Sequence, residues 1–206
     1  MTFQPHLVIL YAGACALLAA IPAALQTLRR PRGVIPAAYR GIHRAPMVAF
    51  ALTAALLSTG FDRSPAEEAH LFMPLEPATA VAVQWLGALV FLYGAWLLVS
   101  GWYSWNNRFG HEADFQDPPG MYTPGALDQV LHPVLSGGLL ALIGAGIAQN
   151  ACLALFMTVV IVLPLGLRKA RYDEIRMVDL YGDHYRQYAD SIGWRRLVPR
   201  WIPMGF

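Results

Sequence analysis

Two short segments in the C-terminal half carry side chains whose types could do chemistry. One is His132, which is followed by Pro133, and the other is the run 171–174, which reads Arg-Tyr-Asp-Glu. A histidine and a pair of acids can bind a charged ligand or transfer a proton. Each segment also has an ordinary structural explanation, because proline is common in the first turn of a helix and charged residues usually lie in solvent. Their role therefore depends on the elements that place them.

Metal and disulfide chemistry have no pattern in this chain. Cys15 and Cys152 lie inside apolar runs and show no CxxC or Cys/His spacing. The six histidines form no HxxxH or HxxHH group, which is the spacing that metal-dependent membrane hydroxylases need. We expect buried cysteines, no metal cofactor and no nucleic-acid partner.

The composition favours lipid as the surrounding solvent. Of the 206 residues, 56% are hydrophobic and 14% are charged, whereas an ordinary soluble domain has roughly 25% charged residues. Long apolar runs can cross the roughly 30 Å hydrocarbon core of a bilayer as helices. The chain is therefore predicted to be an all-α integral membrane protein with a single domain, residues 1–206.

Five apolar segments predict five transmembrane helices and a helical C-terminal tail. The predicted spans are residues 7–28, 45–61, 79–103, 134–149 and 151–167. The last two are separated by little more than Asn150, which predicts a tight helical hairpin. The segments 104–133 and 168–203 are left on one side of the membrane as candidate binding segments.

The distribution of charge predicts the orientation. All of the 15 Lys and Arg residues except Arg63 fall on one side of the five-span arrangement. By the positive-inside rule the N-terminus lies outside and the tail is cytoplasmic. We expect a bacterial inner membrane.

The fourth predicted span is rich in small residues, namely Ser136, Gly137, Gly138, Gly144 and Gly146. Small residues let helix backbones approach closely in lipid. They could equally make room for a ligand, and both explanations stay open.

The order of several weak motifs around the predicted hairpin resembles that of the isoprenylcysteine carboxyl methyltransferase family and of related phospholipid and small bacterial membrane methyltransferases. That family has a Gly-Pro-Tyr-Arg-Tyr-Val-Arg-His-Pro segment, then a Gly-containing helix and, after a hairpin, Glu-Glu, Leu, Phe-Gly, Tyr, Tyr and Val-Pro. The matching residues here are Gly125, Val130, His132, Pro133 and Gly137 in the first part, and Asp173, Glu174, Met177, Tyr181, Gly182, Tyr185, Tyr188, Val198 and Pro199 in the second.

The resemblance implies a pocket for S-adenosyl-L-methionine with His132 and Glu174 as the catalytic pair. A sulfonium cation with an amino-acid end suits a carboxylate, backbone donors at a helix N-terminus and aromatic walls. The cofactor-binding residues that the resemblance implies are Gly125, Leu127, His132, Pro133, Gly137, Tyr172, Asp173, Glu174 and Tyr185. The methyl acceptor would be lipophilic or membrane-delivered: an isoprenylcysteine carboxylate, a lipid amine or a thiol.

Candidate acceptor-side residues are Trp105, Asn107, Arg108 and Arg171. The first three belong to a polar and aromatic patch that an interfacial aromatic belt would explain equally well.

Three positions depart from the family pattern. Leu127, Asp128 and Leu131 stand where the family has Tyr, Arg and Arg. Either Arg171 or Arg176 supplies the missing positive charge, or this chain binds a different ligand.

Methyl transfer from a sulfonium is an in-line displacement that depends mainly on positioning and on exclusion of water. A carboxylate or thiolate acceptor needs no general base. An amine or hydroxyl acceptor does, and His132, Asp128 and Glu174 are the candidates.

Two other functions remain open. Membrane sterol reductases are similar in the same C-terminal region but use NADPH. A non-catalytic scaffold or transporter is the second alternative, although no charged residue interrupts the predicted spans, which disfavours an ion path.

Overall fold

The computed structural model describes residues 40–59, 76–108, 126–192 and 197. All regular structure within these ranges is helical, which confirms the predicted all-α class for them. The elements are α2 (Arg40–Thr59), α3 (Pro77–Arg108), α4 (Ala126–Gln129), α5 (Pro133–Gln149), α6 (Cys152–Met157), the π-helical turn η3 (Thr158–Val162), α7 (Leu163–Tyr181) and α8 (Asp183–Ile192). The predicted span 7–28 lies outside the described residues.

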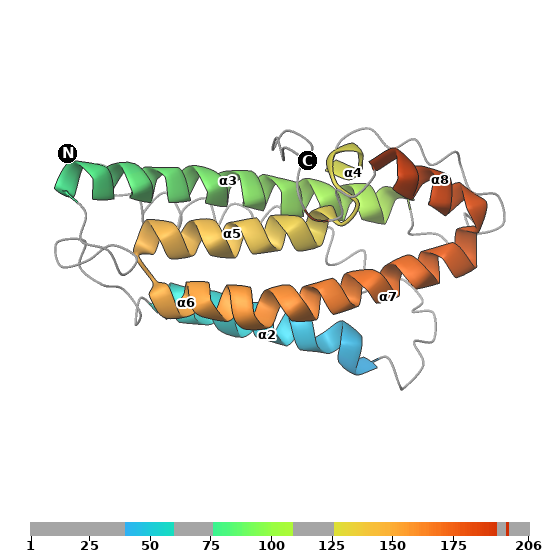
Figure 1. Ribbon diagram of the computed structural model, residues 1–206, viewed down its shortest axis with the longest axis horizontal. Coiled ribbons are helices and arrows are strands. Elements are labelled where there is room, and N and C mark those ends of the chain that lie inside the picture. The colour runs from blue at the N-terminus through green and yellow to red at the C-terminus, as the bar shows by residue number, and fades with distance from the viewer. Residues whose placement is uncertain (1–39, 60–75, 109–125, 193–196, 198–206) are drawn as a thin grey trace.

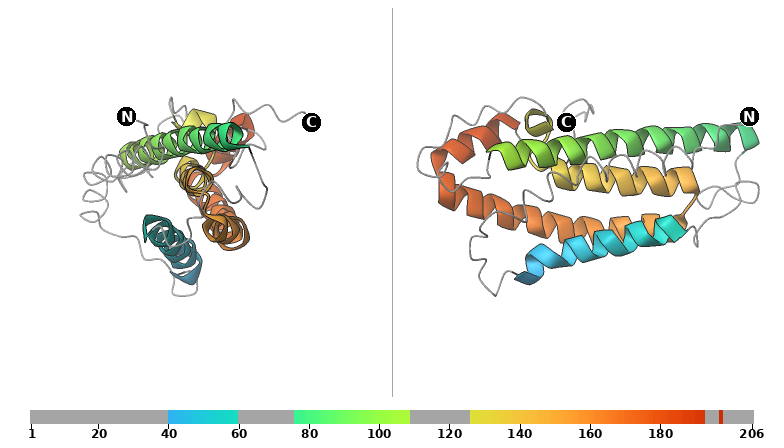
Figure 2. Two further views of the ribbon diagram at one scale, coloured as in Figure 1. Left: turned by 90° about the vertical axis from the view of Figure 1, so that its left-hand side faces the viewer. Right: turned by 180° about the vertical axis from the view of Figure 1, so that it is seen from behind.

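The long helices form an elongated bundle (Figure 1). Helix α5 packs along α3, and α6, η3 and α7 together form a continuous rod on the other side of α5 (Figures 1 and 2). Helix α2 lies beside this rod and runs in the opposite direction. The short helices α4 and α8 gather at the end of the bundle where α5 begins. This end therefore receives the residues that precede α5 and those that follow the apolar part of α7.

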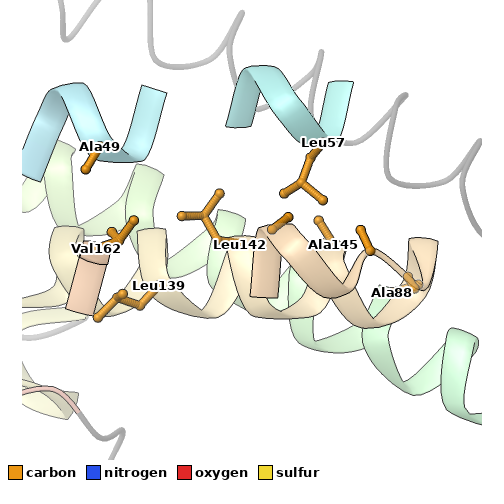
Figure 3. Close-up of a cluster of buried hydrophobic side chains, with 10 residues drawn as sticks. Ala49, Leu57, Ala88, Leu139, Leu142, Ala145 and Val162 are labelled. Carbon is orange, nitrogen blue, oxygen red and sulfur yellow. The ribbon is translucent and has the colours of Figure 1, made fainter. Parts of the chain in front are cut away.

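The main core lies between α2, α5 and the rod. It is built from small and aliphatic side chains, among them Ala49 and Leu57 of α2, Leu142 and Ala145 of α5, and Val162 of η3 (Figure 3). Thr53 is also buried there, and its hydroxyl donates to the carbonyl of Ala49 at 2.9 Å. Helix α2 is thus held by apolar contacts and satisfies its buried hydroxyl within its own backbone.

Helices α3 and α5 approach one another closely because glycines face glycines. A Cβ atom built on Gly87 would lie 2.8 Å from the carbonyl oxygen of Gly144, and one built on Gly94 would lie 2.8 Å from that of Gly137. The glycines recur every seven residues on each helix, the period that keeps one seam of a helix against its partner. Helix packing therefore accounts for the small size of Gly137 and Gly144.

The predicted tight hairpin is confirmed. Helix α5 ends at Gln149, and Asn150 adopts the left-handed conformation with φ 54°. The Asn150 N–H donates to Ile147 O at 3.2 Å and the Ala151 N–H donates to Gly146 O at 2.8 Å. These bonds satisfy carbonyls of the last turn and reverse the chain.

The rod continues well past residue 167, the predicted end of the last apolar span, to Tyr181. This agrees with the predicted helical C-terminal tail. It is regular except at η3, where the backbone takes the wider π-helical turn just before Pro164. Pro164 has no N–H to donate to the preceding turn, which explains why the α-helical ladder is interrupted there. The Thr158 hydroxyl donates to Ala154 O at 2.7 Å inside the same segment.

Helix α3 continues beyond the predicted span 79–103 to Arg108, so Trp105, Asn107 and Arg108 lie on its last turns. The apolar part of the helix ends at Ser104, close to the predicted end of the span. The helix itself continues because polar side chains do not interrupt its backbone hydrogen bonds.

Two helices are long and apolar enough to cross a membrane, Pro77–Ser104 and Cys152–Asp179, each of 28 residues. In the most apolar 18-residue stretch of each helix, only 28% and 22%, respectively, is buried inside the protein. Their large side chains, such as Leu89, Phe156 and Val159, face outward instead. The shorter apolar helices in the described ranges are Arg44–Thr59 and Pro133–Gln149.

Candidate functional site

His132 and Glu174 meet at the end of the bundle where α5 begins. The imidazole Nε2 of His132 lies 3.0 Å from the carboxylate Oε1 of Glu174, a hydrogen-bond distance. The two side chains are 12% and 15% exposed, so the contact is largely shielded from solvent. The two segments in which the sequence places chemically capable residues are therefore in direct contact.

The local backbone explains why the His132 ring is available. His132 is the N-cap residue of α5 and Pro133 opens the helix, where its missing N–H has no consequence. The His132 carbonyl accepts the first helical bond from the Ser136 N–H at 2.9 Å. Its side chain makes no capping bond, so the ring is turned to α7 instead of to its own helix.

A cluster of apolar and aromatic side chains lies beside this pair. Leu131 is buried against Met177 and Tyr181 of α7 and against Tyr185 of α8. Tyr188 lies three residues after Tyr185 on α8 and packs on the same cluster. The cluster fixes α8 on α7 and holds the residue before His132.

Leu131, the residue before His132, is 4% exposed within this apolar cluster. A charged side chain buried there would need a charge partner. Leu131 therefore belongs to the apolar core that supports the site.

Helix α4 is attached to α3 on the other side of the site. The Tyr93 hydroxyl donates to Gln129 Oε1 at 2.9 Å. Ala126 and Val130 are buried against Leu97. The segment that leads to His132 is therefore held by α3 as well as by α7 and α8.

The two acids of the pair have different partners. Asp173 forms an ion pair with Lys169 one turn earlier on α7, while Glu174 contacts His132. Only Glu174 thus presents its carboxylate to the start of α5. Asp173 and Lys169 largely neutralise one another beside it.

The remaining predicted site residues lie at varied distances from this pair. Pro133 is buried next to His132, and Gly137 lies one turn farther along α5 on the face that packs against α3. Tyr172 is half-buried and Arg171 is exposed on α7. Leu127 lies in α4, and Gly125 lies outside the described residues.

The sequence did not single out two groups that the structure places near the site. One is the bond between Tyr93 and Gln129, for which no local pattern exists because the residues belong to different helices. The other is Ser136, whose hydroxyl is buried and has no hydrogen-bond partner within the part of the chain described. In the sequence, Ser136 is only one of several small residues of the span 134–149.

The site offers complementary groups to a zwitterionic ligand. The first turn of α5 contains no acidic residue. Its Val134 and Leu135 N–H groups have no acceptor within the helix, and together with the helix dipole they favour an anionic group. Glu174 lies next to this terminus and favours a cationic group or hydroxyls.

Searches against protein-family models, curated proteins and solved structures give no match to this chain.

Proposed function

We propose that this protein is a membrane-embedded methyltransferase that uses S-adenosyl-L-methionine and acts at the site formed by His132 and Glu174. The observation that carries the proposal is the 3.0 Å contact between these two side chains. The two residues belong to separate segments of the sequence, and the resemblance to membrane methyltransferases points to both. Their meeting at the N-terminus of α5 agrees with the pocket that the resemblance implies.

Residence in a bilayer is supported by the outward-facing apolar surfaces of α3 and of the α6–η3–α7 rod. In the proposed arrangement the five predicted spans cross the membrane, with the N-terminus outside. Residues after α7 and the site itself are then cytoplasmic. The distribution of Lys and Arg favours this orientation.

The residues present fit the cofactor. The amino-acid carboxylate would be held by the backbone N–H groups at the start of α5, and Glu174 would accept hydrogen bonds from the amino group or the ribose. Tyr172 is half-buried on α7 but lies about 200° around the helix from Glu174, so it does not share a face with that carboxylate. When bound, the cofactor supplies an electrophilic methyl group on a sulfonium sulfur.

The chain's own residues would then act by positioning and by managing a proton. His132 and Glu174 fix one another in a partly shielded setting, which keeps both groups oriented for a ligand. For a carboxylate or thiolate acceptor this orientation suffices. For an amine or hydroxyl acceptor, His132 would take up the proton, with Glu174 stabilising the resulting imidazolium.

The proposal is tested by ligand binding to the full chain purified in detergent. Isothermal titration with S-adenosylmethionine and with S-adenosylhomocysteine is expected to show binding to the intact protein. Glu174→Gln and His132→Ala should weaken it by about tenfold or more, the effect of losing a charge-assisted hydrogen bond. Asp183→Asn is a matched control, because Asp183 is an exposed acid on α8 whose partner is Arg186.

Three results would contradict the proposal. One is the absence of binding at millimolar ligand, and another is equal binding by the Glu174→Gln variant and the intact protein. The third is thermal stabilisation by NADPH but not by S-adenosylmethionine, which would instead support the reductase alternative.

A further inference from the structure

The cytoplasmic half of α7 exposes two arginines beside exposed apolar side chains. Arg168 and Arg171 are both exposed, and they lie on one side of the helix together with Leu167 and Ile175. Ile175 is 62% exposed. An aliphatic side chain that stays uncovered beside guanidinium groups is typical of a surface that meets both the hydrocarbon and the headgroup layers of a bilayer.

A third exposed arginine lies at the same level on the neighbouring helix. Ala49 of α2 lies near Val162 of η3 in the core (Figure 3), and the two helices run antiparallel (Figure 1). Arg44 precedes Ala49 by about 7.5 Å of helix and Arg168 follows Val162 by about 9 Å, at 1.5 Å per residue. Arg44 is also exposed. The two helices therefore carry their arginines to the same end of the apolar surface.

The nearby acids are already engaged. Asp173 is paired with Lys169, and Glu174 contacts His132. Within the described part of the chain, Arg44, Arg168 and Arg171 form no ion pair. Their positive charge is therefore not neutralised by the helices described.

We propose that Arg44, Arg168 and Arg171 form an arginine belt that binds the phosphate groups of anionic lipids. Guanidinium groups bind phosphate oxygens in pairs, and juxtamembrane arginines are attracted to anionic leaflets. The belt adjoins outward-facing aliphatic residues of α6 and η3, so a lipid whose headgroup lies on the arginines can place its chains along that surface. The inference rests on the membrane placement in the proposed function and is independent of the methyl-transfer chemistry.

The test compares lipid retention by the full chain and its variants. Protein reconstituted in vesicles of equal phosphatidylglycerol and phosphatidylcholine content is extracted gently, and the retained lipids are quantified by mass spectrometry. The intact protein is expected to retain phosphatidylglycerol preferentially. Replacement of Arg168 or Arg171 by Gln should lower this preference by about fivefold for each arginine, the factor for one juxtamembrane charge.

The matched control is Arg186→Gln, because Arg186 is an exposed arginine of α8 that is paired with Asp183. It should leave the preference unchanged. Equal retention of both lipids by the intact protein, or an unchanged preference after all three belt arginines are replaced by Gln, would overturn the belt. Membrane insertion is measured separately, by flotation of the intact protein with pure phosphatidylcholine vesicles. If the intact protein does not float with these vesicles, the membrane placement itself is wrong.

Discussion

The close contact of α3 with α5 predicts that the same substitution has opposite effects at two glycines. Gly94 of α3 faces the backbone of α5, and an added Cβ would lie 2.8 Å from Gly137 O and 2.8 Å from the carbonyl carbon of Leu140. Ordinary contacts of this kind begin at 3.4 Å. The obstructing atoms are backbone, so Gly94→Ala can be accommodated only if the two helices move apart by about half an ångström or more along the seam.

The expected change in stability of the Gly94→Ala protein follows from two opposing effects. Overpacking of a close contact costs about 1–3 kcal/mol, and the better helix propensity of alanine returns about 1 kcal/mol. We expect the upper part of the overpacking range because backbone cannot change rotamer, which leaves a net loss of about 2 kcal/mol. For a chain of this length that loss lowers the unfolding temperature by about 4–8 °C.

Gly41→Ala is the internal control. Gly41 lies on α2, is exposed and has no atom within 4 Å of an added Cβ. Only the propensity effect remains, so this variant should be as stable as the parent or slightly more stable. Thermal unfolding of the detergent-solubilised proteins, followed by circular dichroism at 222 nm, measures both. A Gly94→Ala protein at least as stable as the parent would refute the close packing described for α3 and α5.

Three further substitutions test the surroundings of the site. His132→Ala should destabilise the protein by about 1–3 kcal/mol, because the shielded Glu174 carboxylate loses its hydrogen bond to His132. A thermal scan that shows no change would mean that the contact is not maintained. Tyr185→Ala removes a buried ring and should cost about 3 kcal/mol, with faster proteolysis at α8, and unchanged proteolysis would argue against its docking role. Tyr93→Phe removes the hydrogen bond to Gln129 at a cost of about 1 kcal/mol, and hydrogen exchange in α4 should rise, whereas unaltered exchange would count against this attachment.

Helix positions could be predicted wherever the apolar pattern and the chain-reversing residues agreed. The hairpin around Asn150 and the start of α5 at Pro133 were both recognisable, because one residue ends a helix and the other begins one by local chemistry. The end of α3 was not recognisable, because a change from apolar to polar residues marks the end of an apolar surface and not the end of a helix. Helix α3 therefore extends to Arg108, beyond the predicted span 79–103.

The α3–α5 seam had a sequence signal that was overlooked. Gly87, Gly94 and Gly101 follow one another at seven-residue intervals, as do Gly137 and Gly144. The small residues of the span 134–149 are uninformative alone, whereas the span 79–103 repeats its glycines with the same period. Two equal periods are the signature of a seam between two helices.

The contact between His132 and Glu174 required more than local rules. Nothing in the composition of either segment brings them together, and only the resemblance to membrane methyltransferases linked them. By contrast, the partner of Asp173 could have been read from the four-residue spacing to Lys169, which is favourable on any helix. Short-range pairs are visible in a sequence, while pairs between helices depend on how the bundle is assembled.

The π-helical turn η3 changes which side of the α6–η3–α7 rod faces the rest of the bundle. The buried positions of the rod recur every fourth residue: Ala154, Thr158, Val162, Gly166 and Ala170. In an unbroken α-helix this spacing would rotate the buried face by about 160° over the run, because each step of four residues overshoots a turn by about 40°. The wider turn absorbs one extra residue and so takes back about 100° of that rotation.

The register of Glu174 against His132 is thus linked to a single extra residue far from either of them. Deleting one residue within Thr158–Val162 would let the turn close to an ordinary α-helix with the downstream phase retained. Deleting one residue after η3, such as Leu167, would rotate Glu174 by about 100° away from the start of α5. The first deletion should preserve ligand binding and the second should abolish it. The wide turn therefore sets the side of the rod on which Glu174 lies.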